Sequence, residues 1–128
     1  MSAGSVSRIE IIVEIKGKFQ SKCELKRHLA PKTVGTITRS LPLEGNAHVM
    51  GNSFVYTDTK INVGGERQRT QFKKGDVSFM ASTGSICFFI NDAESTKAMT
   101  PIGTITSNVD ALNNVKPGDV FVITQAAV

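Results

Sequence analysis

Hydrophobic and polar residues alternate along two neighbouring stretches near the start of the chain. Every odd-numbered residue from Ile9 to Ile15 is apolar, and most of the residues between them are charged. This period of two indicates a strand with one buried face. A similar alternation runs through residues 19–25, after the short connection Lys16-Gly17-Lys18. The two stretches are therefore predicted to form an antiparallel hairpin.

The stretch Ala30–Pro42 allows two structures. Pro31 suits the first turn of a helix, and Val34, Ile37 and Leu41 would share one helical face. The many β-branched residues and the interior glycine favour a strand instead. The residues alone leave both alternatives open.

The remaining pattern predicts further short strands separated by turns. Phe54 and Tyr56 share one strand face, and Val55 takes the other. Asn108 is predicted to cap a short helix that ends in the turn before the last strand. The sum is a mainly β protein, a barrel or sandwich of about eight strands with one or two short helices. Later strands are expected at 76–80, 85–90, 102–106 and 120–124, the second helix at 109–115, and loops at 64–75 and 91–101.

Length and composition indicate one globular domain. The chain has 128 residues, of which 40% are hydrophobic and 20% charged, as in ordinary soluble domains. Residues 1–7 are expected to be a flexible tail and 8–128 the barrel domain. No apolar run approaches the ~20 residues that span a bilayer, so no membrane partner is expected. The start of the chain does not resemble a secretory signal.

The two cysteines, Cys23 and Cys87, both fall on the apolar phase of predicted strands. Without an export signal, such cysteines are predicted to be buried reduced thiols and not a disulfide. Together with the absence of a signal peptide, this predicts a cytoplasmic protein.

Charge is distributed unevenly along the chain. Residues 1–75 hold 13 Lys or Arg against 6 Asp or Glu, and residues 76–128 hold 2 against 5. The polar loop Gly64–Gly75 carries four of the basic residues together with Phe72. A basic loop with an aromatic residue is one feature of nucleic-acid binding, although a solvated loop has the same composition. Interleaving of the two halves in one barrel would remove the asymmetry.

Six stretches of the chain share an order and spacing with a known family: APKTV (30–34), MGNSFVY (50–56), GDVSFMASTGSICFFI (75–90), TPIGTI (100–105), VDALNNV (109–115) and GDVFVI (118–123). In this order they resemble the cyclophilin family. The resemblance covers roughly residues 8–125, and in length the chain resembles most the small prokaryotic cyclophilin-like family of poorly defined function. It implies a closed barrel of about eight strands and resolves the ambiguous stretch as a helix over 31–41.

The resemblance also implies a site for a proline ring. Phe89 matches the aromatic floor of the cyclophilin proline pocket, and Met80 and Ala81 match the neighbouring strand. An aromatic pair such as Phe88-Phe89 in a barrel strand is more often core than pocket, and alternation buries one of the two whatever the function. The ligand-binding residues that the resemblance implies are Phe54, Tyr56, Met80, Ala81, Phe89 and Met99.

Most of the catalytic constellation of cyclophilins is missing. Tyr56 stands where the family has its catalytic arginine, Met99 falls near the position of the pocket histidine, and the chain contains no tryptophan. Arg67 or Arg69 could supply a guanidinium from the neighbouring loop. The chain is therefore expected to bind a peptide or a small apolar ligand, with weak or no prolyl isomerase activity. The alternatives are an active isomerase with a rebuilt donor set and a module that binds protein or nucleic acid through the basic loop.

Other chemistry has little support in the sequence. His28 and His48 do not have zinc-like spacing with the cysteines, and Gly64-Gly65 lacks the pattern of a phosphate-binding loop. Ser82 and Thr83 are better explained as turn residues than as nucleophiles. No metal and no cofactor are expected, and the sequence leaves the oligomeric state open.

Overall fold

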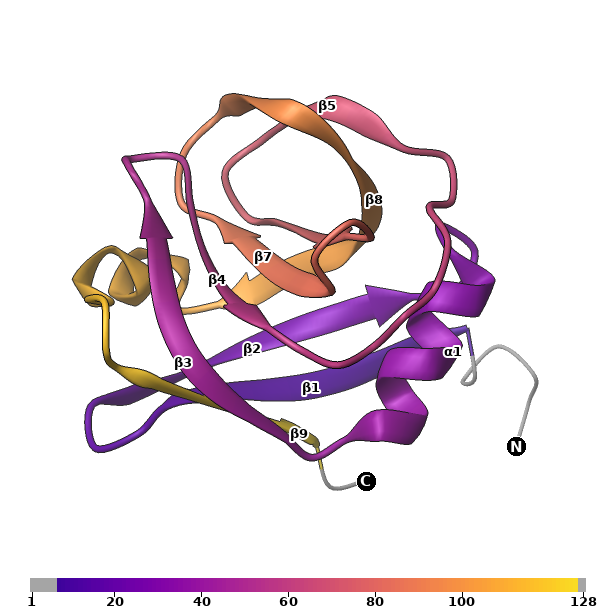
Figure 1. The fold of residues 1–128 in the computed structure, drawn as a ribbon. Coiled ribbons are helices and arrows are strands. Elements are labelled where there is room, and N and C mark those ends of the chain that lie inside the picture. The colour runs from indigo at the N-terminus through magenta and orange to yellow at the C-terminus, as the bar shows by residue number, and fades with distance from the viewer. Residues whose placement is uncertain (1–6, 127–128) are drawn as a thin grey trace.

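Eight antiparallel strands close into a barrel, and a ninth strand lies over part of its outer surface (Figure 1). The strands are β1 (Arg8–Ile15), β2 (Phe19–Lys26), β3 (Leu43–Met50), β4 (Phe54–Asp58), β5 (Arg69–Phe72), β6 (Asp76–Met80), β7 (Ser85–Phe89), β8 (Ala93–Ser107) and β9 (Val120–Gln125). Around the barrel the order is β2, β1, β9, β3, β4, β7, β6 and β8, and β8 pairs back with β2. The predicted mainly β fold is confirmed.

The computed structural model describes residues 7–126. Of the predicted flexible tail, residues 1–7, only Ser7 falls within this range. Its carbonyl oxygen accepts a hydrogen bond from the backbone N–H of Arg27 at 2.9 Å.

The predicted hairpin is formed by β1 and β2, which pair along their whole length from Ile15 opposite Phe19 to Arg8 opposite Lys26. The odd-numbered residues of β1 point into the barrel, where Ile11, Val13 and Ile15 are almost completely buried. The alternation in the sequence thus corresponds to the inner and outer faces of the barrel wall.

The two helices occupy the predicted positions. α1 (Pro31–Ser40) buries Val34 and Ile37 against the barrel, which confirms the helical alternative for this stretch. The second helix, η2 (Val109–Asn114), is a single stretch of 3₁₀-helix. Its predicted cap is wrong: Asn108 has a left-handed backbone, and its side chain donates to the carbonyl oxygen of Gln20 instead of capping the helix.

The two long predicted loops are also wrong, because both contain strands. β5 lies within the predicted loop 64–75, and the first part of β8 lies within 91–101. These two segments pair with each other and cover the outside of the barrel next to β7 and β6. They were missed because each carries few apolar residues, spaced too far apart to show a period. Their buried side chains belong to a second apolar cluster, the outer cluster, which comprises Phe54, Phe72, Cys87, Phe89 and Met99.

The aromatic pair of β7 is buried on both sides of the barrel wall. Phe88 points into the barrel and stacks on Phe121 with ring centroids 5.4 Å apart. Phe89 points outward into the outer cluster and stacks on Phe72 at 4.6 Å. Both side chains are fully buried, because the β5–β8 pair covers the side that would otherwise meet solvent.

Both cysteines are buried free thiols, as predicted. Burial raises the pKa of Cys23 to about 12. Burial likewise raises the pKa of Cys87 to about 12, and the charge of Asp58 adds to this, although a hydrogen bond from Ser78 opposes it. Thiols with such pKa values are hardly ionised at neutral pH, so neither cysteine is a nucleophile in the folded protein.

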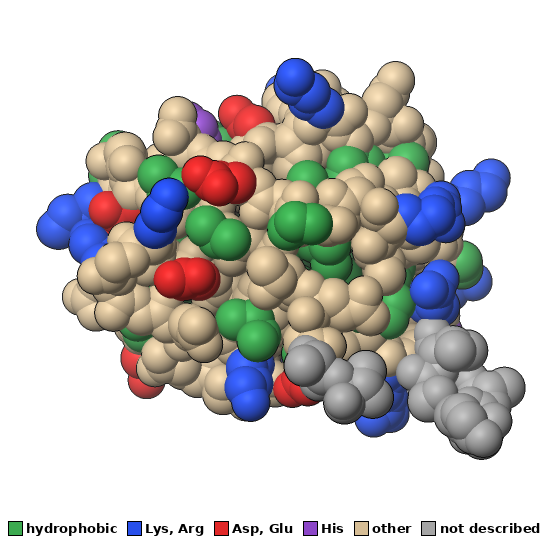
Figure 2. All heavy atoms as spheres, turned by 90° about the horizontal axis from the view of Figure 1, so that it is seen from below, with side chains coloured by type: hydrophobic (Ala, Val, Ile, Leu, Met, Phe, Trp, Pro, Cys, Tyr) green, Lys and Arg blue, Asp and Glu red, His purple; other side chains and the backbone are tan. Residues whose placement is uncertain are grey.

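The two halves of the chain interleave, so its charge asymmetry does not divide the molecule in two. β9, from the acidic half, lies between β1 and β3 from the basic half. Figure 2 shows acidic and basic side chains mixed over much of one face, with Lys and Arg predominating toward the side on which α1 lies. Exposed Lys32 and Arg39 belong to this helix.

The first turn of α1 is capped from a distant part of the chain. Ala30, at the cap position, offers no side-chain acceptor. The Glu66 carboxylate instead accepts hydrogen bonds from the backbone N–H groups of Lys32 at 3.3 Å and Thr33 at 2.8 Å, and from the Thr33 hydroxyl at 2.8 Å. Burial alone would raise the Glu66 pKa, but these hydrogen bonds and the Lys32 charge outweigh it and lower the pKa below its ordinary value.

We expect Glu66→Ala to lower the free energy of unfolding by about 1 kcal/mol at pH 7, the usual contribution of a helix cap. Because the folded protein lowers the Glu66 pKa, the ionised carboxylate stabilises the fold above the pKa of the unfolded chain. This stabilisation is lost as the pH falls through the folded pKa. Urea unfolding at pH 7 and pH 3 should therefore show a difference from wild type that shrinks in acid. Glu44→Ala, at an exposed position of β3, is the control and should change stability by less than about 0.5 kcal/mol.

Candidate ligand-binding cleft

A cleft of about 440 Å³ opens on the outer side of the barrel where β4 and β6 face the start of β8. Its apolar wall consists of Phe54, Tyr56, Met80 and the exposed Met50. Ser53, Asp58, Thr83, Ser85 and residues 94–97 supply the polar lining. We call this hollow the Tyr56 cleft. Its size and its mixture of apolar wall and polar rim are typical of small-ligand sites.

Two features of the strands build the cleft. The alternation along β4 turns Phe54, Tyr56 and Asp58 outward, while Val55 packs into the barrel core. In β8, Met99 pairs with Arg69 and Glu94 pairs with Gln71, so residues 95–98 of β8 lie opposite the single residue Thr70 of β5. The surplus residues between Glu94 and Met99 form a bulge beside the cleft.

A short hydrogen-bond chain fixes the carboxylate of Asp58 at the polar wall. Its Oδ1 accepts a hydrogen bond from Ser85 Oγ at 2.5 Å, and Ser85 Oγ also lies 2.6 Å from Thr83 Oγ1. On the other side, His48 Nε2 lies 3.7 Å from Asp58 Oδ2, and the His48 ring stacks on Tyr56 with centroids 5.1 Å apart.

This arrangement does not form a nucleophilic triad. The carboxylate lies between serine and histidine, whereas a triad needs the histidine between the other two. Ser85 is also almost completely buried. The group that the arrangement offers to a ligand is therefore the fixed carboxylate of Asp58.

The structure brings together three of the predicted ligand-binding residues. Phe54, Tyr56 and Met80 line the Tyr56 cleft. Phe89 and Met99 are fully buried in the outer cluster, and the Phe89 ring centroid lies 5.0 Å from that of Phe54. Ala81 packs against the main barrel core. Phe89 thus supports the cleft from behind Phe54 and does not form its surface.

The two candidate arginines lie elsewhere. Arg67 donates from Nη1 to the carbonyl oxygen of His28 at 3.1 Å. Arg69 donates from Nη2 to Asp76 Oδ2 at 3.3 Å, and its guanidinium lies 4.9 Å from the centroid of the Phe72 ring. Among the described residues that line the Tyr56 cleft there is no arginine.

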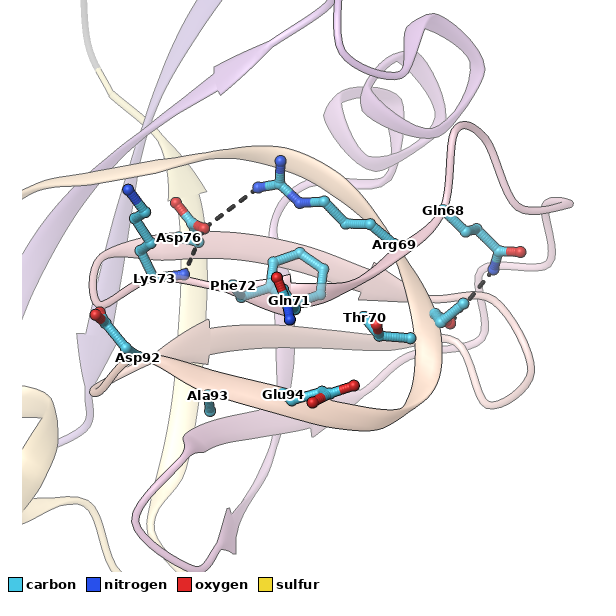
Figure 3. A pocket seen from close by; sticks show the side chains of 11 residues that line it. Gln68, Arg69, Thr70, Gln71, Phe72, Lys73, Asp76, Asp92, Ala93 and Glu94 are labelled. Atoms are coloured by element: carbon cyan, nitrogen blue, oxygen red, sulfur yellow. Dashed lines mark hydrogen bonds and ion pairs between the residues drawn. The ribbon is translucent and has the colours of Figure 1, made fainter.

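Arg69 belongs to a second hollow, the β5 groove, of about 1060 Å³ (Figure 3). This groove is larger, but two of its charged side chains, Arg69 and Asp76, already bond to each other. Asp76 accepts hydrogen bonds from Arg69 and from the backbone N–H of Lys73, and the Gln68 amide donates to the carbonyl oxygen of Ala98. The Tyr56 cleft, with its apolar wall and the exposed carboxylate of Asp58, is the better candidate for a ligand site.

The residues that the sequence did not indicate come mostly from the bulge. Glu94 and Lys97 fell in a predicted loop, and nothing in their spacing places them beside β4. The position of Asp58 on the cleft side of β4 could have been predicted, because Asp58 continues the alternation of Phe54 and Tyr56.

Residues 7–126 hold neither a cluster of metal-ligating side chains nor a helix that could span a membrane. No group of three or more His, Cys, Asp or Glu side chains in this range could hold a metal ion. No helix in the same range is both long enough and apolar enough to cross a membrane.

The closed barrel, its covering helix and the outer cleft define a cyclophilin-like domain. The chain belongs to the cyclophilin-like family, whose model matches residues 7–124. No sequence among the curated proteins matches the chain.

Two solved structures share the fold. The solution structure of the hypothetical protein AF2241 from Archaeoglobus fulgidus superposes with a TM-score of 0.81 and 23% identity, over 94% of this chain and 96% of that one. McbB, solved in complex with tryptophan, superposes with a TM-score of 0.76 and 15% identity. That match covers 92% of this chain and 46% of McbB, so the chain spans a little under half of that protein. At these identities the likeness concerns the fold alone.

Proposed function

We propose that the protein is a peptide- or small-ligand-binding module that uses the Tyr56 cleft and has weak or no prolyl isomerase activity. The observation that carries this proposal is the cleft itself, in which Tyr56 and Met80 present apolar surface beside polar groups. The ligand we infer has an apolar or proline-like ring that packs on this wall. A guanidinium that could assist amide rotation is missing from the described lining.

The proposal also includes a cytoplasmic location, and it treats nucleic acid as the second candidate partner. Two buried reduced thiols are compatible with a cytoplasmic protein. Nucleic acid is the less favoured partner, because the cations of the predicted basic loop are dispersed. Arg67 bonds to the turn before α1, Arg69 pairs with Asp76, and Lys74 pairs with Asp110.

The test is binding of N-acetyl-Phe-Pro-amide, measured by chemical-shift perturbation and calorimetry. Wild type should bind it, and Tyr56→Ala should weaken binding by about tenfold, because truncation removes apolar contact area worth roughly 1.5 kcal/mol. The matched control is Ile12→Ala, at a half-buried position on the outer face of β1, which should leave affinity unchanged. N-acetyl-tryptophanamide is a second neutral probe, chosen because McbB was solved with tryptophan. Shifts confined to residues outside the cleft, or equal binding by Tyr56→Ala, would contradict the proposal.

A further inference from the structure

The charge of the Tyr56 cleft is opposite in sign to that of the whole chain. The protein carries a formal net charge of +4, yet the charged residues that line the cleft are two carboxylates, Asp58 and Glu94, and one ammonium group, Lys97. No ion pair among the described residues joins Lys97 to either carboxylate. A negative site on a basic protein points to a ligand with positive charge.

Asp58 is the better placed of the two carboxylates. Its Oδ1 is fixed by the Ser85 hydroxyl, and its Oδ2 has His48 Nε2 at 3.7 Å, which is beyond hydrogen-bond distance. One oxygen is therefore anchored, and the other, which has the His48 ring beside it but no hydrogen bond from a described residue, can accept one from a ligand. The side chain of Asp58 is 55% exposed, so a ligand that enters the cleft can reach it.

Desolvation favours a cationic ligand further. A neutral ligand that covers the cleft would take water from the Asp58 carboxylate and return no charge to it, which is costly. A protonated amine would replace that water with a charge-assisted hydrogen bond, roughly twice as strong as a neutral one. The apolar wall lies on the same side of β4 as Asp58, because positions 54, 56 and 58 share one face.

We propose that the Tyr56 cleft selects ligands that carry a protonated amine next to an apolar ring. The amine pairs with Asp58, and the ring packs on Phe54, Tyr56 and Met80. This inference rests on the proposed function and names its ligand class. Peptides with a free N-terminus and small cyclic or aromatic amines meet the requirement, whereas N-acylated peptides meet only the apolar half of it.

The experiment compares Phe-Pro-amide, which has a free amine, with N-acetyl-Phe-Pro-amide by calorimetry on the full chain. The free amine is expected to bind about tenfold more tightly at low salt. Asp58→Asn, which keeps the volume and the oxygen that accepts from Ser85, should abolish this preference, so that the two peptides bind with similar affinity. The matched control is Asp110→Asn, on η2, which should keep the preference.

The outcomes separate the two proposals. Equal binding of both peptides would overturn the amine inference and leave the proposed function standing, whereas no binding of either would overturn the proposed function. Should a melting curve show that Asp58→Asn is unfolded, the preference of wild type is measured at about 20 and 500 mM NaCl, between which screening weakens a charge pair at an open site. A preference that does not fall with salt, or that survives in folded Asp58→Asn, also overturns the inference.

Discussion

Turnover of a prolyl tetrapeptide by this protein is expected to lie about 10²–10³-fold below that of a typical cyclophilin, the usual loss when one preorganised donor is missing. The barrier to rotation about a peptide bond is ~18–20 kcal/mol and arises from amide resonance. An enzyme lowers it by holding the twisted amide with donors that are in place before the reaction. In the cleft, the position that resembles the catalytic arginine holds Tyr56, and Arg67 and Arg69 are bonded elsewhere.

The measurement is kcat/KM for wild type, Tyr56→Phe and Tyr56→Arg. Tyr56→Phe should have little effect, because the neutral hydroxyl is not expected to contribute much. Tyr56→Arg should raise turnover, because it places a guanidinium at the position that resembles the catalytic arginine. These variants are sharper tests than Phe89→Ala, since Phe89 is fully buried and its truncation would disturb the outer cluster. Turnover at the level of a typical cyclophilin, abolished by Tyr56→Phe, would refute the prediction and make the protein an isomerase with a rebuilt donor set.

Gly103→Ala is expected to destabilise the barrel by about 3 kcal/mol, at the upper end of the usual cost of overpacking. Gly103 lies where β8 pairs with both β2 and β6. A Cβ atom at this position would collide with the backbone carbonyl of Glu24 and would lie 3.0 Å from the Cα of Leu25. Backbone atoms cannot move aside as a flexible side chain can, so the strand pair that closes the barrel would have to separate.

Chemical unfolding at pH 7 measures this effect, with Gly64→Ala as the control. A Cβ at Gly64 would meet nothing within 4 Å, so this variant should change stability by less than about 0.5 kcal/mol. A loss of that small size in Gly103→Ala would mean that β8 and β2 can shift apart at little cost. Such a result would also mean that β8 and β2 do not pack tightly where the barrel closes at Gly103.

The strands of the barrel wall could be predicted because each has a hydrophobic pattern that is complete within its own short stretch of sequence. Alternation along 9–15 and 19–25 defines β1 and β2 without reference to the rest of the chain. For α1 the residues conflicted, and the resemblance to cyclophilins settled the choice. The strands that cover β7 could not be predicted, because Phe72 and Met99 are single apolar residues whose partners lie far away in sequence. Their strand conformation depends on pairing and not on intrinsic preference.

Part of the cleft could be predicted from the sequence in the same way. Phe54 and Tyr56 share a face by alternation, and Met80 reaches the same face from β6. The position of the bulge between Glu94 and Met99 depends on the register between β5 and β8, which the sequence does not encode locally. For the same reason, resemblance placed Phe89 at the pocket surface, whereas here it is covered by Phe72.

Because β7 is buried on both faces, the strand that supports the cleft is expected to open to solvent only rarely. A barrel strand with one face in water can fray while the rest of the protein stays folded. β7 has no such face, because all five of its residues are buried and it pairs with β4 on one side and β6 on the other. Its amide hydrogens can meet solvent only when the barrel and its cover open together, so their exchange should report global unfolding. Ser85, which holds Asp58, begins this strand, and the cleft wall is thus anchored in a strand whose amide hydrogens are expected to exchange slowly.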